Sequence, residues 1–423
     1  MLKIRYSVLF TFYLSFCFSQ GKMNAFGIGH YYHFQGIGNA ADGISNINPT
    51  FQSDVSLSNP STWHDLDYSF LTISYSGNES IWNSTSSSNG YSILSNAALI
   101  VPYKSKLSFG IVLSPYSDQR IELVDSVMTP FNAFGNEYNY VRSFKRNGGV
   151  MSLKIGTSYK LNDILGFGIF HNILFGSSRQ NESIFFDGSS IVQSSIAQYD
   201  GISQDVFINL SVFKDLIIST KYTYIIRPLR GVFEQKNLFD DANGNGYHDY
   251  LSPLDFPAPY PDSTSKFFNI SNLHEPSGYT FGVSRFLKSG SSLSIELGTY
   301  KDNSKIENKI RLPLENKIKN TNSLKLAFSH YPKELSFDLM DKFSLKAGLI
   351  YHEHMLRMNG DKINEFGYSL GIGFKFKPIG NQIDLNYYYG NRSYINTNEK
   401  ETIQQVQLAI SLADIWFVKR RQK

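Results

Sequence analysis

The stretch EFGYSLGIGFKFKPIGNQIDLNYYYGNRS, residues 365–393, consists of two alternating runs joined by a Pro-Ile-Gly turn. In the first run, large apolar residues occupy every second position from Phe366 to Phe376, with glycine, serine or lysine between them. The second run repeats this pattern with Ile383, Leu385, Tyr387 and Tyr389. A period of two predicts β-strands with one apolar face and one small or polar face. The fold depends on whether the apolar face meets another sheet or lipid.

The composition of the 423-residue chain favours one large β-architecture. The chain is 15% aromatic and only 18% charged, with 27 Tyr and 33 Phe, and aromatic residues are enriched in strands. No change in composition or linker divides the chain, although its length would allow two or three soluble domains. The formal net charge of +4 gives no reason to expect a nucleic-acid partner.

The N-terminus has the pattern of a secretory signal peptide. Lys3 and Arg5 precede an apolar stretch over 6–16, and small residues follow near Ser19. We therefore expect residues 1–19 to be removed after Ser19; a lipoprotein site at Cys17 is less favoured because bulky Phe16 precedes it. Cleavage would remove the only cysteine and exclude disulfides and cysteine-ligated metals. No later apolar run is long enough for a spanning helix.

The same alternation recurs in about fourteen predicted strands. Each is about nine to fourteen residues long, whereas strands of soluble proteins are commonly about five or six and membrane-crossing strands about nine to eleven. The length therefore favours a membrane. The predicted strands are 68–76, 91–101, 106–115, 148–161, 164–176, 204–213, 216–227, 277–287, 291–301, 321–330, 343–354, 364–377, 381–391 and 402–412.

The connections between these strands alternate between short and long. Two or three residues suffice at 162–163, 214–215 and 378–380, whereas 116–147, 177–203 and 228–276 are long, the last being the longest. Tight periplasmic turns and extended external loops are typical of transmembrane β-barrels. We predict an all-β fold: an antiparallel barrel over 67–423 in the outer membrane of a Gram-negative bacterium, with a short basic tail and its apolar face toward lipid. A secreted sandwich or propeller is the alternative. The connection 331–342 is too long for the scheme and indicates a helical turn or an error of register.

Residues 20–66 do not alternate, and their Gly, Asn, Ser and Pro residues favour turns. We expect this segment to fold into the lumen as a hatch or plug, because a barrel of about fourteen strands has room for one. A loose periplasmic tail is the alternative. The low charge and several apolar side chains argue against disorder.

Motifs at the two ends resemble a known family. GIGNAA (36–41) and LSNPSTW (57–63), with Asn59-Pro60, are similar to the start of FadL-like outer-membrane transport proteins of Bacteroidetes and neighbouring phyla. GYSLGIGF (367–374), LNYYYG and ISLADIWFVKRR resemble their last strands. Ser61 replaces the usual Ala, and the chain continues past its last strand through 419–423, which departs from many barrels.

The resemblance implies a fourteen-stranded barrel with an N-terminal hatch. It also implies passive diffusion of hydrophobic small molecules, such as long-chain fatty acids or hydrocarbons, from an external apolar groove to a lumen site. Release would follow a shift of the hatch or a lateral opening of the wall. No motif matches ligand-contact residues, so the substrate residues are unknown.

The same phyla use FadL-like barrels in type IX secretion, which gives a second function. In this alternative, the chain is a non-transporting structural barrel of a secretion or surface-assembly complex. An apolar tunnel would favour transport, whereas a sealed lumen with apolar patches on external loops would favour the complex.

The segment DDANGNGYHDY (240–250) resembles a calcium-binding loop. Gly246 stands at the sixth position, where such loops turn, and oxygen ligands stand at positions one, three, five, seven and nine. Ser252 replaces the usual bidentate Glu at position twelve, and Asp240 or Asp255 could substitute for it. We expect a weak structural Ca²⁺ site in the external loop; an Asn/Gly turn without metal is the alternative. The expected ligands are Asp241, Asn243, Asn245, the Tyr247 carbonyl and Asp249.

Other candidate sites are weaker. His352-Glu353-His354 puts two imidazoles on one face of a strand end, which could bind zinc or copper, although a solvated strand end is the favoured interpretation. The pair His30 and His33 could bind the same metals, and a position without metal is again the favoured interpretation. No Gly-x-Ser-x-Gly, P-loop or His-Glu-x-x-His motif occurs, so we predict no catalytic residues and no enzyme activity.

Overall fold

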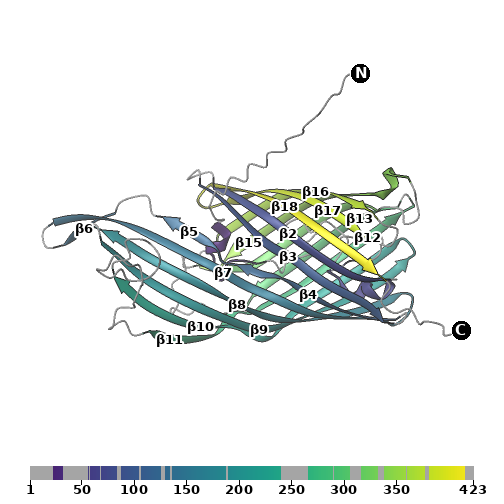
Figure 1. The fold of residues 1–423 in the computed structure, drawn as a ribbon, viewed down its shortest axis with the longest axis horizontal. Helices are drawn as coiled ribbons and strands as arrows, with labels where there is room; N and C mark the ends of the chain where they lie inside the picture. The colour runs from purple at the N-terminus through teal and green to yellow at the C-terminus, as the bar shows by residue number, and fades with distance from the viewer. Residues whose placement is uncertain are drawn as a thin grey trace, which may run out of the picture.

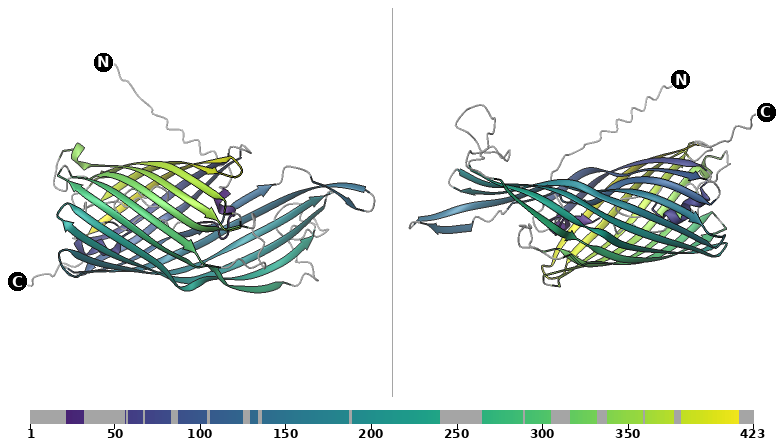
Figure 2. Two further views of the ribbon diagram at one scale, coloured as in Figure 1. Left: turned by 180° about the vertical axis from the view of Figure 1, so that it is seen from behind. Right: turned by 90° about the horizontal axis from the view of Figure 1, so that it is seen from below.

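The computed structural model is a closed antiparallel β-barrel of 14 strands (Figures 1 and 2). The structure describes residues 22–31, 56, 58–66, 68–82, 87–103, 106–124, 129–133, 136–186, 189–239, 265–288, 290–304, 316–331, 338–358, 360–376 and 381–414. The barrel strands are β2 (Ser69–Trp82), β3 (Ser87–Tyr103), β4 (Leu107–Asp118), β7 (Asn136–Lys160), β8 (Leu165–Phe186), β9 (Ser189–Phe213), β10 (Leu216–Phe239), β12 (Pro276–Leu287), β13 (Ser291–Asp302), β14 (Ile318–His330), β15 (Phe343–Leu356), β16 (Lys362–Lys375), β17 (Gln382–Tyr394) and β18 (Glu399–Asp414).

The first and last strands close the barrel. β18 pairs antiparallel with β2 from Glu401↔Trp82 to Asp414↔Ser69. Closure leaves neither strand with a free edge, which is the condition for a sheet to cross lipid. The predicted fold class is confirmed.

Seven shorter elements accompany the barrel. None of the helices in the described ranges has the length and apolar character needed to cross a membrane. β1 pairs with β4, β5 and β6 pair with β7, and β11 pairs with β10. The elements are η1 (Lys22–Ala25), β1 (His30–Tyr31), η2 (Pro60–Asp65), β5 (Ile121–Val124), β6 (Thr129–Ala133), β11 (Lys266–His274) and η3 (Met340–Lys342).

The apolar face of the strands points out of the barrel. On β16, Phe366 and Leu370 are 56% and 55% exposed, while Glu365 and Ser369 point inward and are buried. All described strands belong to one sheet, so no second sheet among them covers the outward side chains. A continuous apolar surface of this kind fits hydrocarbon rather than water.

One end of the barrel has the short turns that the sequence predicts. Between β7 and β8, the side-chain oxygen of Asn162 accepts hydrogen bonds from the backbone N–H groups of Ile164 (2.9 Å) and Leu165 (2.7 Å). Such an Asx turn reverses the chain within a few residues. The longer connection 331–342 ends in the 3-10 turn η3, and residues 332–337 lie outside the described residues.

The predicted long loops at the other end are wrong over much of their length. The expected loops 116–147, 177–203 and 228–276 consist largely of strands, because β7, β8, β9 and β10 are 25, 22, 25 and 24 residues long. About ten residues suffice to cross a membrane, so the rest projects about 40 Å along the strand direction. Figure 1 shows β7–β10 continuing past the barrel rim beside β5, β6 and β11. The alternation stops there because neither face meets lipid, while backbone pairing continues.

Candidate functional site: the lumen, its N-terminal segment and a gap in the wall

The short-turn end of the lumen holds η2. Trp63 is fully buried, and its ring packs edge-on against Phe170 with centroids 5.3 Å apart. The indole N–H donates to the Ser56 carbonyl at 3.0 Å. Asn59 caps the helix, because its side-chain oxygen accepts from the Ser61 N–H at 3.1 Å, and Pro60 occupies the first helical position. The predicted motif Asn59-Pro60 thus fixes the local structure of η2.

Glycines in the barrel wall make the seat for η2. A Cβ atom on Gly110 of β4 or Gly156 of β7 would lie 2.6 or 2.5 Å from the Trp63 ring. One on Gly168 of β8 would lie 2.3 Å from the backbone nitrogen of Ser61. Contacts this short require either structure to shift, so the wall and the helix are complementary in shape.

Residues 22–31 are bound at the long-loop end. The Arg146 guanidinium donates to the carbonyl oxygens of Asn24 (2.5 Å), Gly27 (3.0 Å) and Gln119 (3.1 Å). These charge-assisted hydrogen bonds join β7 to the N-terminal segment and to the residue after β4.

Lys22 provides a second attachment at this end. Its backbone nitrogen donates to Glu401 at 3.1 Å, and its ammonium pairs with Glu399. The ammonium also lies 4.8 and 4.6 Å from the ring centroids of Trp82 and Tyr394, within the range of a cation–π interaction.

The described parts of the segment 20–66 are therefore held at opposite ends of the barrel. This is unlike a loose tail. Residues 32–55, which include GIGNAA, lie outside the described residues, so the hatch as a whole remains a prediction.

The N-terminal segment and the wall enclose an apolar cluster toward the long-loop end. Met23, Phe26 and Ile28 come from the segment, and the other members come from the strands around it. The members from the wall are Tyr116, Val150, Leu174, Ala197, Tyr199, Leu229, Phe233, Ile270, Ile318, Leu356, Ile363 and Tyr394. An apolar ligand could replace part of these contacts.

The wall next to this cluster is interrupted between β3 and β4. The two strands pair from Tyr103↔Leu107 to Ala97↔Leu113, and among the described residues no pairing between them continues beyond this point. β3 continues paired with β2, and β4 continues paired with β7. Pro115, at a shift of register, lies where β4 leaves β3. Tyr116 of the apolar cluster follows it, so the cluster borders the gap.

The N-terminal segment covers part of this gap. β1 pairs with the freed edge of β4, as His30↔Asp118 and Tyr31↔Ser117. The Arg120 guanidinium donates from Nε to the Asp118 carboxylate at 2.9 Å. Its Nη1 donates to the Ser92 carbonyl oxygen of β3 at 3.4 Å. Side-chain and segment contacts thus replace the missing strand pairing.

Another part of the lumen holds a buried polar group. Arg392 pairs with Glu365 at 2.6 Å and with Glu401 at 3.6 Å, and all three side chains are buried. His352 and His354 lie beside this group, 4% and 1% exposed, with stacked rings 5.7 Å apart. The favoured interpretation of these histidines as a solvated strand end is wrong, because the strand continues and turns both rings inward.

In the N-terminal segment, His30 and Asp65 have shifted pKa values. Burial, and then the nearby Arg392 guanidinium, lower the pKa of His30 to about 3, so this imidazole is neutral at neutral pH. For Asp65, burial raises the pKa, but the hydrogen bond and charge of His64 and the ammonium of Lys160 outweigh it and hold the pKa below its usual range. The His64 Nε2 atom lies 3.2 Å from the Asp65 Oδ2 atom.

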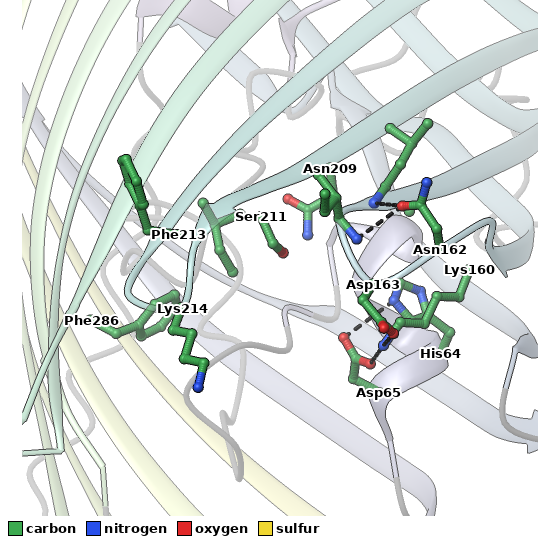
Figure 3. A pocket seen from close by; sticks show the side chains of 14 residues that line it. His64, Asp65, Lys160, Asn162, Asp163, Asn209, Ser211, Phe213, Lys214 and Phe286 are labelled. Atoms are coloured by element: carbon green, nitrogen blue, oxygen red, sulfur yellow. Dashed lines mark hydrogen bonds and ion pairs between the residues drawn. The ribbon is translucent and has the colours of Figure 1, made fainter.

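A polar pocket of about 340 Å³ opens at the short-turn end between η2 and the wall (Figure 3). His64, Asp65 and Lys160 line one side, and Phe213, Lys214 and Phe286 line the other. The His64 ring also contacts the Ser158 hydroxyl at 3.2 Å. The carboxylates of Asp65 and Asp163 balance the ammonium groups of Lys160 and Lys214 in this lining, which gives no preference for a cation or an anion.

The predicted calcium ligands lie outside the described residues. Asp241, Asn243, Asn245, Tyr247 and Asp249 belong to the stretch 240–264 before β11, and the Ca²⁺ site stays a prediction. In the ranges that the structure describes, no group of three or more His, Cys, Asp or Glu side chains is arranged to hold a metal ion.

Solved structures of a FadL homologue and of TodX are similar in fold to this one. A FadL homologue from Pseudomonas aeruginosa has a TM-score of 0.55 and 13% identity, covering 93% of this chain and 100% of that one. A deltaS2 mutant of the monoaromatic hydrocarbon channel TodX has a TM-score of 0.53 and 10% identity, covering 91% and 100%. The toluene transporter TodX from Pseudomonas putida has a TM-score of 0.46 and 10% identity, covering 94% and 98%. The two matches with TM-scores above 0.5 establish the FadL-type outer-membrane barrel fold.

Sequence comparisons assign the chain to a family. No curated protein matches it. The family model described as BamG matches residues 1–423, which is the whole chain. The chain therefore belongs to the BamG family.

Proposed function

We propose that this protein is a passive outer-membrane transporter for hydrophobic small molecules, such as long-chain fatty acids or hydrocarbons. The observation that carries the proposal is the gap between β3 and β4 beside the buried apolar cluster. A wall that is unpaired at one seam lets a ligand pass from the lumen into lipid without breaking hydrogen bonds between β3 and β4. The fold shared with FadL and TodX structures supports this function by analogy.

The packing of η2 favours lateral release over release into the periplasm. At the short-turn end, Trp63 and the glycines around it pack η2 against β3, β4, β7, β8 and β9 with ordinary core contacts. Opening that end would cost several kcal/mol, as for other fully buried aromatic residues. Leaving through the seam requires that β1 and Arg120 move away from β4 and β3, while the paired part of β3 and β4 stays intact.

A cross-link across the seam tests the proposal. Asn96 and Ser114 are the first positions beyond the last β3–β4 pair, and both are buried in the lumen. The variant Asn96→Cys/Ser114→Cys, reconstituted in liposomes, should take up a fluorescent fatty acid when reduced and lose uptake when oxidised. The control Asn209→Cys/Ser219→Cys joins paired positions of β9 and β10 and should transport in both states. Undiminished uptake through a verified seam cross-link would rule out the lateral route.

A second function is favoured by the projecting strands of β7–β10, which reach well beyond the barrel rim. Such a platform suits a structural barrel in a surface-assembly or secretion complex, and the buried polar group in the lumen is consistent with that role. A protein that co-purifies stoichiometrically from native membranes and is lost when the projection is shortened would support this function. Absence of uptake in the liposome assay would then exclude transport.

We further propose, from the fold, an outer-membrane location reached after cleavage near Ser19, and a non-enzymatic role. Mass spectrometry of the mature N-terminus tests the cleavage.

A further inference from the structure

Stacked tyrosines on the outer surface mark one level of the barrel. Tyr222 of β10 stacks on Tyr279 of β12 with centroids 4.6 Å apart, and on Tyr224 with centroids 5.6 Å apart. Tyr279 is 62% exposed on the outward face. Tyrosines gather where hydrocarbon gives way to head groups, so this cluster marks the interface on the long-loop side.

Two arginines lie immediately beyond the tyrosines on the same strand. Strict alternation would put Arg227 and Arg230 on opposite faces of β10. The pairing with β9 shifts register twice here, so that Arg227 pairs with Ile202 and Arg230 with Asp200. These two partners are two residues apart and share the outward face. The bulge therefore directs both guanidinium groups outward, as bulges commonly re-aim side chains.

One carboxylate holds both arginines in place. Asp200 contacts the Arg230 Nε at 2.5 Å and the Arg227 terminal nitrogen at 3.5 Å. The two arginine side chains are 50% and 55% exposed, whereas that of Asp200 is 34% exposed. The group keeps a net charge of +1, and most of the five donors on each guanidinium still face outward.

Three neighbouring outward positions are apolar. Phe175 of β8 is paired with Asp200, Val232 follows along β10 and Ile226 precedes the bulge. All three are apolar and between 39% and 51% exposed. The site thus combines two planar cations with apolar surroundings at the level of the membrane interface.

We propose that Arg227, Arg230 and Asp200 form a binding site for the phosphate group of an anionic lipid in the outer leaflet. Guanidinium groups bind phosphate oxygens in a bidentate manner, and the Asp200 carboxylate offsets part of their positive charge while the site is empty. The lipid chains lie along Ile226 and the tyrosines below. Occupation of the site fixes the height of the barrel and the base of the projecting strands in the membrane.

Lipid binding to the detergent-solubilised full chain tests this site by native mass spectrometry. The probe is a bisphosphorylated lipid A-type glycolipid, and the comparison arms are its dephosphorylated form and inorganic phosphate. Wild type should retain only the bisphosphorylated probe. The variant Arg227→Gln/Arg230→Gln should bind it at least about tenfold more weakly, since each lost charged hydrogen bond is worth about that factor.

Two further variants distinguish the lipid site from a structural ion pair. Arg285→Gln removes an exposed arginine that pairs with Asp215 on the opposite rim, and it should bind like wild type. Asp200→Asn raises the net charge of the site to +2, so this variant should bind the lipid as tightly as wild type or more tightly. If the three side chains formed only a structural ion pair, its loss would weaken lipid binding instead. Equal binding by wild type and the double variant, equal loss in Arg285→Gln, or equal occupancy by inorganic phosphate would overturn the proposal. If the glutamine pair fails to fold, weaker binding by Asp200→Asn would overturn it equally.

Discussion

The fit between Gly110 and Trp63 predicts a strong coupling between the barrel wall and η2. In Gly110→Ala, the new methyl group would lie 2.6 Å from the Trp63 ring and 3.1 Å from the Ile100 side chain. Ordinary contacts are about 1 Å longer than the first distance, so the indole must move. Overpacking of this kind costs about 1–3 kcal/mol. Trp63→Ala alone should cost about 3–5 kcal/mol of η2 attachment, because a fully buried aromatic side chain is removed.

The double variant should show that these costs share one contact. With the indole gone, the methyl group that Gly110→Ala introduces meets only the flexible end of Ile100, and alanine also restricts the unfolded strand more than glycine. Gly110→Ala should therefore be neutral or slightly stabilising in the Trp63→Ala background, which gives a coupling free energy of about 1–3 kcal/mol. Hydrogen exchange of the backbone N–H groups of 61–66 measures this locally, since about 1.4 kcal/mol of opening free energy changes the exchange rate tenfold. Equal effects of Gly110→Ala in the wild-type and Trp63→Ala backgrounds would refute the proposed fit between Gly110 and Trp63.

Four further outcomes are expected. Asn59→Ala should weaken η2 by about 1 kcal/mol in the same exchange measurement, because the cap of the Ser61 N–H is lost. Arg146→Ala should release residues 22–31, at a cost of about 3 kcal/mol for unpaired buried carbonyls, and should expose them to proteolysis. The folded-state pKa of Asp65 is lowered, so its contribution to the stability of η2 is complete above its unfolded pKa of about 4 and is lost as pH falls through the folded value. Hydrogen-exchange protection of η2, corrected for intrinsic rates, should therefore be constant near neutrality and fall only in acid. Asp65→Asn should remove this pH dependence. Calorimetry should detect Ca²⁺ binding to wild type and not to Asp241→Ala, and identical heats would remove the calcium site.

The membrane-crossing part of the fold follows from the sequence, because lipid on one side and a polar lumen on the other force strict alternation. β16 is predicted at 364–377 and observed at Lys362–Lys375. The ends of β7–β10 could not be predicted in this way, because beyond the membrane both faces contact water or protein and periodicity no longer reports pairing. The seat of η2 was missed for a different reason. Gly110 and Gly156 fit the pattern of small inward residues, and only the position of Trp63 reveals that glycine is needed there.

The gap in the wall and the N-terminal segment depend on each other physically. A strand edge without partners is unstable in a membrane, because each unpaired backbone group in hydrocarbon costs several kcal/mol. Beyond Leu113, β4 has such an edge, and β1 pairs with part of it while Arg120 binds a carbonyl of β3. β3 and β4 can therefore remain unpaired beyond Leu113 only while residues of the N-terminal segment are bound beside them. Removing Arg146 should consequently affect the seam as well as the segment, because both are held by the same guanidinium. Faster exchange of β4 amides beyond Leu113 in Arg146→Ala, with unchanged exchange in the paired part of β4, is the signature of this dependence.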